Sequence, residues 1–427
     1  MFKRLFYVII ALQVTAVSAS GQGFLKRLGE RAANAGSDLL IKKSTQKAEK
    51  VIDGNQSKKS KEGNGEKIEN GSLDNNETQK STKQLSSSYS RYDFIPGEKI
   101  ILFDNFEQDA IGEFPMKWFT TGSGEVVKLE GKDNKWLQFN SGNMLSPTMK
   151  LPENFTVEFD LVVNLSTRSS AVFPGFKFEL FDRGDKAKRL DSYNYTLKNI
   201  LYFSNSFDRD KAVVRLDSRE NAKQKLLSDK IFLKGFQSNY GSVVHVAISI
   251  QKTRVRLWYN AEKVLDIPTA AAFPANYNQM LFVGGKTGEG YPAFFITNLR
   301  VAAGMADMRS KLLEGGNFVT NGILFDSNSD RIKPESMGLI KEIASVIKES
   351  SGAKIKIVGH TDTDGNADSN LELSKKRAIS VKTVLSKEFD VDASLLFTDG
   401  KGAAEPVASN TTPTGKSENR RVEFIKM

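Results

Sequence analysis

The hydrophobic periodicity of this 427-residue chain changes near residue 305. Before that point, short β-branched and aromatic runs recur, and in the run FTVEFDL at residues 155–161 apolar residues alternate with polar ones. A period of two predicts β-strands that bury one face. Downstream, strand-like runs alternate with runs of helical spacing. We therefore predict a multidomain protein, with an all-β domain at 97–304, a linker at 305–315 and an α/β domain of βαβαβ order at 316–427.

The all-β region is predicted to be a jelly-roll-like β-sandwich. Its runs at residues 245–250, 254–259 and 260–265 resemble the late hairpins of concanavalin-like jelly rolls. An eight-stranded barrel in the outer membrane would also show alternation. The unequal lengths and spacings of the strands favour the sandwich over the barrel.

Composition and motifs argue against an enzyme. The chain has no cysteine and two histidines, which excludes thiolate nucleophiles, cysteine-bound zinc, iron–sulfur clusters and disulfides. The run EFD at residues 158–160 resembles the start of the paired-carboxylate strand of jelly-roll glucan hydrolases, but valines stand where the second glutamate would be. We therefore predict no catalytic residue, metal site or cofactor. Glu158 and Asp160 are expected on the solvated face of a strand, and His245 is expected to be a packed histidine.

The amino terminus predicts export. A basic start at Lys3 and Arg4, an apolar run of about 13 residues and small residues after it form a signal peptide at 1–19. That run is too short to span a membrane, which takes about 20 apolar residues. Residues 20–53 are predicted to form a basic amphipathic helical segment, which either lies on anionic lipid or acts as a spacer. Residues 54–96 are rich in Ser, Lys, Asn, Gly and Glu and are predicted to be a disordered linker.

A helix near residue 380 is predicted to present a row of polar side chains. A capping box at residues 369–372 is expected to begin this helix, which ends near residue 388. Asn370, Ser374 and Arg377 are spaced i, i+4 and i+7, so they project from one face of the helix.

A polar turn precedes this helix and carries a carboxylate. The run GHTD at residues 359–362 follows a strand-like run and ends in Asp362. If Asp362 faces the guanidinium of Arg377, the pair suits a zwitterion: the carboxylate takes an ammonium, and the arginine fork takes a carboxylate through two parallel hydrogen bonds. The alternative interpretation is an ion pair that only ties the turn to the helix.

Several short motifs follow one another along the carboxyl-terminal region. They are FD at residues 325–326, IKPE at 332–335, GHTD at 359–362, Asn370 with LS at 373–374 and RA at 377–378, and NRRVE at 419–423. Together they resemble the OmpA-like peptidoglycan-binding domain over residues 316–427. The resemblance implies that Asp362 and Arg377 grip the diaminopimelate of the peptidoglycan stem peptide. It also implies that Asp326, Asn370 and Arg420 line the same pocket.

The charge distribution bears on the partner. The formal net charge is +10, but residues 316–427 carry equal numbers of basic and acidic side chains. Recognition by this region is therefore expected to be local and stereospecific. An exported chain without a clustered basic and aromatic face is not expected to bind nucleic acid.

The sequence as a whole predicts a protein exported to the periplasm or outer membrane of a Gram-negative bacterium. It would bind peptidoglycan non-covalently through the diaminopimelate of the stem peptide, without catalysis, and tether the β domain or the outer membrane to the wall. The β domain would face a glycan or an envelope protein. Two alternatives stay open: a wall-anchored glycan hydrolase or lectin in the β domain, and an outer-membrane β-barrel with a periplasmic tether.

Overall fold

The structure is a computed structural model that describes residues 92–165, 173–182, 199–304, 307–350 and 352–427. The predicted signal peptide at 1–19, the helical segment at 20–53 and the linker up to residue 91 lie outside the described residues. Among the residues described, no helix has the length and apolar character needed to cross a membrane.

Two antiparallel sheets form the all-β region. The first contains β1 (Lys99–Asp104), β3 (Ser123–Val127), β4 (Trp136–Ser141), β6 (Asn154–Val163), β12 (Val243–Gln251), β13 (Arg254–Tyr259), β14 (Glu262–Ile267) and β16 (Phe294–Ala303). Its order is β14-β13-β12-β6-β16-β4-β3, and β1 pairs with β16 so that Lys99 lies opposite Ala303.

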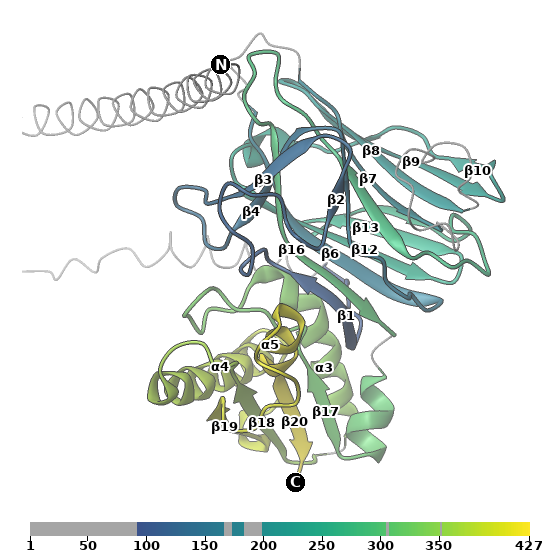
Figure 1. Cartoon of the computed structure of the whole chain (residues 1–427). Helices are drawn as coiled ribbons and strands as arrows, with labels where there is room; N and C mark the ends of the chain where they lie inside the picture. The colour runs from purple at the N-terminus through teal and green to yellow at the C-terminus, as the bar shows by residue number, and fades with distance from the viewer. Residues whose placement is uncertain (1–91, 166–172, 183–198, 305–306, 351) are drawn as a thin grey trace, which may run out of the picture. The chain divides into compact units, whose positions relative to one another are not determined.

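The second sheet faces the first across the core (Figure 1). It contains β2 (Phe119–Thr120), β5 (Asn143–Leu145), β7 (Phe176–Phe181), β8 (Ile200–Phe207), β9 (Ala212–Glu220), β10 (Lys223–Leu227), β11 (Ile231–Phe232) and β15 (Gln279–Val283). Its order is β10-β9-β8-β7-β15-β5-β2, with β11 on β9, and a single-turn helix η2 (Phe236–Asn239) follows β11. The predicted all-β sandwich is confirmed, and below we call this region the sandwich.

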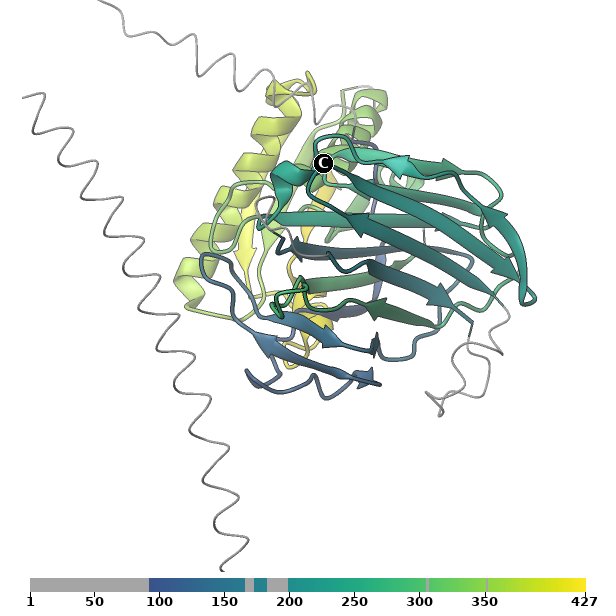
Figure 2. The same cartoon turned by 90° about the horizontal axis from the view of Figure 1, so that it is seen from above.

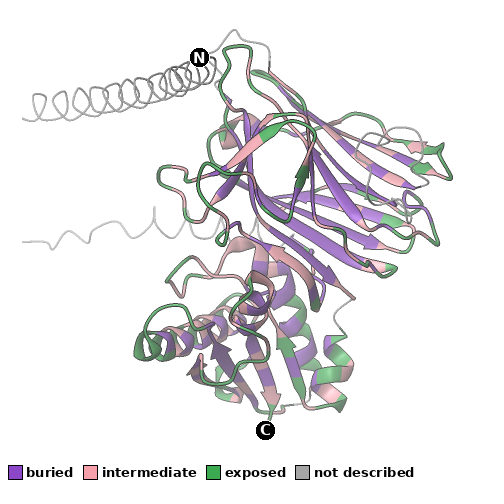
Figure 3. Cartoon of the chain, viewed as in Figure 1, coloured by how far each residue is buried: buried purple, intermediate pink, exposed green. Residues whose placement is uncertain are grey.

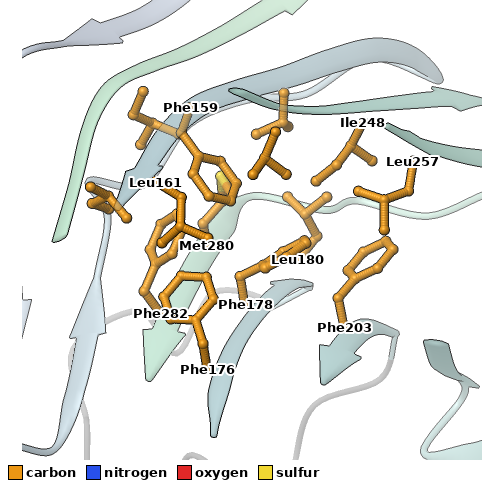
Figure 4. Packing of buried hydrophobic residues seen from close by; sticks show 14 of the residues in the cluster. Phe159, Leu161, Phe176, Phe178, Leu180, Phe203, Ile248, Leu257, Met280 and Phe282 are labelled. Carbon is orange, nitrogen blue, oxygen red and sulfur yellow. The ribbon is translucent and has the colours of Figure 1, made fainter. Parts of the chain in front are cut away.

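Phenylalanines fill the space between the two sheets (Figure 4). Phe159 on β6 meets Phe178 and Phe282 edge to face, at centroid distances of 5.4 and 5.3 Å. Phe178 also stacks on Phe203 of the neighbouring strand at 4.7 Å. Burying each such ring contributes about 1.5–3 kcal/mol. The alternation along residues 155–161 therefore predicts the inner face of β6 correctly, because its apolar residues all join this core. The strand as a whole is buried (Figure 3).

The outer face of the same strand is also buried, which corrects the prediction for Glu158 and Asp160. Their side chains are 4% and 7% exposed, and Thr156 beside them is 1% exposed. The backbone of the segment before β1 covers this face, where Gly97 N–H donates to the Thr156 hydroxyl at 2.9 Å. The α/β region covers it too, because Arg300 on β16 donates to the side chain of Asn321 at 2.7 Å.

The last five residues of the predicted disordered linker, 92–96, are packed in the structure. Tyr92 and Phe94 are each 1% exposed, and Phe94 meets the ring of Trp258 edge to face at 5.2 Å. On the other side they lie close to Gly338, where an added Cβ would be 2.7 Å from the carbonyl oxygens of both residues. Glycine is required there because two backbones approach without room for a side chain.

The α/β region contains one four-stranded sheet with two long helices. Its strands are β17 (Asn317–Thr320), β18 (Ile355–His360), β19 (Leu396–Gly402) and β20 (Val422–Lys426), in the order β17-β20-β18-β19, with only β18 and β19 parallel. The helical elements are η3 (Ser310–Glu314), η4 (Pro334–Ser336), α3 (Met337–Glu349), α4 (Ala367–Lys387), η5 (Ala393–Leu395) and α5 (Pro413–Asn419). α4 lies alongside the sheet, and both α3 and α4 share one core with the strands (Figure 2).

Two predicted helix starts have different outcomes. Pro334 begins the short turn that leads into α3, as expected from a proline whose missing N–H is harmless in a first turn. The capping box predicted at residues 369–372 is wrong, because α4 begins at Ala367. Asn366 caps it, accepting the N–H groups of Asp368 and Ser369 at 2.9 and 3.2 Å. Asparagine is as good an N-cap as serine, and here it comes first along the chain.

Candidate functional site

The five residues predicted to bind a ligand line one cavity of about 400 Å³. The turn after β18 supplies Asp362, α4 supplies Asn370 and Arg377, the loop before η4 supplies Asp326, and the end of α5 supplies Arg420. Whether these side chains bind a ligand stays a prediction, but the fold brings them to one place.

Asp362 is held in the turn by two neighbours. Its Oδ1 accepts the N–H of Asp364 at 3.1 Å, and its Oδ2 accepts a hydrogen bond from Arg420 Nη1 at 2.5 Å. Asn370 fixes the turn itself, because its amide donates to the carbonyl oxygens of Asp362 and Asp364 at 3.3 and 2.9 Å. Asn370 therefore fixes the conformation of the turn that places Asp362 at the wall of the cavity.

Arg377 has a different environment. Its Nε donates to the carbonyl of Ser329 at 3.0 Å, and its guanidinium lies over the ring of Phe325 at 4.8 Å. Burial and the nearby charge of Arg420 lower the pKa of Arg377 to about 10, so it remains charged at neutral pH. In the described part of the chain no ion pair joins Arg377 to a carboxylate, and Asp362 pairs with Arg420 instead. The alternative interpretation of a structural pair between Asp362 and Arg377 is therefore not what the structure shows.

Two further predicted positions behave differently from each other. Asp326 lies in the loop of residues 326–331 and pairs with the exposed Arg331. Ser374, expected on the same polar face as Arg377, is buried instead. Its hydroxyl donates to the carbonyl of Leu371 at 2.7 Å and accepts the N–H of Gly402 at 2.9 Å. Ser374 thus fastens α4 to β19 and is not part of the cavity.

The carboxyl-terminal region is similar to known proteins. The OmpA family matches residues 324–420. The outer-membrane lipoprotein YfiB of Pseudomonas aeruginosa is 38% identical over 113 residues, which are 26% of this chain and 67% of YfiB. This chain belongs to the OmpA family.

The α/β region, which contains this match, is called the OmpA-family domain below. Two more proteins are similar over about a quarter of the chain. The probable lipoprotein YiaD of Escherichia coli is 43% identical over 104 residues, which are 24% of this chain and 47% of YiaD, so the chain spans about half of that relative. A solved structure, the peptidoglycan-associated lipoprotein of Burkholderia pseudomallei, is 28% identical and covers 25% of this chain and 88% of that chain, with a TM-score of 0.23. The sandwich lies outside the family match. YfiB is named as an outer-membrane lipoprotein, and this chain is likewise an envelope protein, exported to the periplasm or outer membrane.

Residues of the sandwich line the same cavity as the residues of the OmpA-family domain. Sequence reasoning missed these lining residues, which are Phe103, Asn105, Glu107, Asn134, Glu158, Asp160, His245, Asn298 and Arg300. They lie far from the family motifs along the chain, and only the packing of the two regions brings them together. The one signal in the sequence was the pair of carboxylates on the polar face of β6.

Buried charges at this side of the cavity neutralise one another. Asp160 accepts from His245 Nδ1 at 2.9 Å, while His245 Nε2 lies 3.5 Å from Glu158. Burial opposes a charge on His245, but the hydrogen bond to Asp160 and the nearby carboxylate of Glu158 outweigh it and raise the pKa of His245 to about 10. Arg300 Nη1 donates to Glu158 at 2.5 Å. The predicted burial of His245 is confirmed, but its neighbours are carboxylates and not an apolar core.

The cluster of Glu158, Asp160, His245 and Arg300 thus contains two carboxylates and two cations. Burial raises the pKa values of Glu158 and Asp160, but the cations more than reverse this and hold both pKa values below the usual range. No group of three or more His, Cys, Asp or Glu in the described ranges is placed to hold a metal ion.

Proposed function

We propose that the OmpA-family domain binds peptidoglycan non-covalently through the diaminopimelate of the stem peptide. One observation carries this proposal: Arg377 has no carboxylate partner among the described residues, and it lines the same cavity as the carboxylate of Asp362. The free end of diaminopimelate is a zwitterion, with one ammonium and one carboxylate on the same carbon. Membership of the OmpA family and the envelope location support this choice of ligand.

Each side chain has room for its half of the ligand. The guanidinium of Arg377 can donate two parallel hydrogen bonds to a carboxylate, since only its Nε is engaged by the carbonyl of Ser329. Asp362 Oδ1 accepts one backbone N–H, so a ligand ammonium can share that oxygen. Two charge-assisted contacts at about 1.5–3 kcal/mol each supply much of the roughly 8 kcal/mol of micromolar binding.

The binding is a tether and involves no bond making or breaking. The named relatives are outer-membrane and other lipoproteins, and none of their names is that of an enzyme. In this role the OmpA-family domain holds the wall, and the sandwich, or the outer membrane with it, is what becomes tethered. A glycan or another envelope protein would be the partner on the free surface of the sandwich.

Cosedimentation with purified sacculi tests the proposal. The full chain should pellet with sacculi whose stem peptides contain diaminopimelate, and free diaminopimelate should release it. Sacculi that carry lysine at the same position are the matched control, since lysine lacks the carboxylate that Arg377 would bind. Equal binding to both kinds of sacculi, or binding that free diaminopimelate does not disturb, would contradict the proposal.

A further inference from the structure

The first strand of the sandwich is fastened to the helix that carries Arg420. The N–H of Phe103 on β1 donates to the hydroxyl of Thr414 at 3.1 Å, and this hydroxyl donates back to the Phe103 carbonyl at 3.4 Å. Gln108, beyond β1, donates to the carbonyl of Thr411 at 2.8 Å, just before α5. Arg420 directly follows α5 as its C-cap, so its position depends on where β1 lies.

The side chain of Phe103 reaches the same arginine. The guanidinium of Arg420 lies over the Phe103 ring at 5.5 Å and donates to Asp362 at 2.5 Å. An arginine attracted to the face of a ring loses some of its freedom to turn away. The ring therefore favours the orientation in which Arg420 meets Asp362.

The two arginines of the cavity are supported in the same way by two different regions. Arg377 lies over Phe325 of the OmpA-family domain at 4.8 Å, and Arg420 lies over Phe103 of the sandwich at 5.5 Å. Only the second ring comes from outside the domain that the family match covers. The support of Arg420 is thus a feature of this chain that the family motifs do not contain.

The contact between the two regions is fixed by further bonds. Arg300 Nη2 donates to the carbonyl of Gly97 at 3.1 Å and to Asn321 at 2.7 Å, joining the sandwich to the loop after β17. Gly322 in that loop lies against the ring of Pro96, where an added Cβ would be 2.4 Å away. These contacts fix the position of β1 relative to the cavity.

We infer that the sandwich forms part of the peptidoglycan pocket and that its residue Phe103 influences the affinity for the ligand. Phe103 is a positioning residue: it orients Arg420 against Asp362 and so prepares the carboxylate for the ligand ammonium. This inference rests on the proposed function and adds to it that the binding affinity of the OmpA-family domain depends on a side chain of the sandwich.

The test measures binding of a soluble muropeptide that ends in diaminopimelate to the full chain by calorimetry. Phe103→Leu keeps the apolar bulk and removes the ring, and we expect its Kd to rise about three- to tenfold. Phe103→Tyr keeps the ring face and should restore the Kd to within about twofold. Phe232→Leu is the matched control, because this ring is 66% exposed on β11 and does not line the cavity.

The outcomes separate the inference from the proposed function. If Arg377→Lys weakens binding while Phe103→Leu binds as the unchanged chain does, the proposed function stands and the inference is wrong. If the unchanged chain does not bind the muropeptide, both are wrong. If Phe103→Leu lowers the melting temperature, Thr414→Val tests the same contact between β1 and α5 from the side of α5. Rescue of the Kd by Phe103→Tyr then shows that the ring face is what matters. Failure of the tyrosine variant to rescue would count against the inference.

Discussion

Glu158 and Arg300 of the sandwich face the same cavity as Asp362 and Arg377 of the OmpA-family domain, but the charges are arranged differently. Glu158 and Arg300 are about 5% exposed, and each is paired. Arg377 is only partly buried and has no carboxylate partner in the described part of the chain, although Asp362 is near enough to influence its pKa. The charges of the sandwich thus pair with one another inside one sheet, whereas the OmpA-family domain leaves one charge available. Substitutions in the two regions should therefore have different effects.

Removing one member of the sandwich cluster should have the largest effect on stability. Glu158→Ala leaves Arg300 and a protonated His245 buried without their shared carboxylate, which costs about 3–5 kcal/mol. Urea unfolding measures this by tryptophan fluorescence, since the three tryptophans all lie in the sandwich.

The matched control for Glu158 is an ion pair of the same sheet at the surface. Asp266 accepts from Arg254 at 2.7 Å, with side chains 26% and 46% exposed. Asp266→Ala should therefore cost no more than about 1 kcal/mol. Similar losses for Glu158→Ala and Asp266→Ala would mean that the buried pairs of Glu158 stabilise the sandwich no more than a surface pair does.

Arg377→Lys should have the next largest effect, on binding and not on stability. A lysine keeps the charge but cannot offer two parallel donors to one carboxylate, so a loss of about 1.5–3 kcal/mol, roughly 10- to 100-fold in Kd, is expected. Calorimetry with the diaminopimelate muropeptide measures it. Arg309→Lys is the control, because Arg309 is 70% exposed and pairs with Glu349 away from the cavity. An unchanged Kd for Arg377→Lys would remove the basis of the zwitterion site.

The stabilising contribution of His245 is expected to depend on pH. Its pKa is about 10 in the folded chain and about 6.5 when unfolded, so its stabilising contribution is complete below pH 6.5 and is lost as the pH rises through 10. Between pH 7 and 9 the free energy of unfolding should fall by roughly 2–3 kcal/mol for this reason. The charged groups that determine the pKa are Asp160 and Glu158 on β6 and Glu335 on η4.

His245→Gln provides the comparison for this pH dependence. Glutamine does not titrate, so the fall in stability between pH 7 and 9 should become shallower even though the variant is less stable at pH 7. Urea unfolding at pH 7, 8 and 9 measures both chains. Parallel pH profiles would show that His245 is not protonated in the folded protein.

Features set by residues close together in the sequence are easier to predict than contacts between distant parts of the chain. The inner face of β6 follows from an alternation over a few residues, and Asp362 and Arg377 come from motifs on adjacent elements. The burial of Glu158 and Asp160 could not be predicted in this way, because the residues that cover them come from other parts of the chain. The bond between Phe103 and Thr414 joins residues 311 positions apart, and no local pattern marks it.

The pairing of Lys99 with Ala303 has a mechanical consequence. The chain enters and leaves the sandwich side by side, so a pull between the two ends would peel β1 from β16 one hydrogen bond at a time. Phe94 is wedged between Trp258 and α3 immediately before this point. Force applied upstream of residue 92 would therefore reach Trp258 of the sandwich and α3 of the OmpA-family domain together, before it reaches β1.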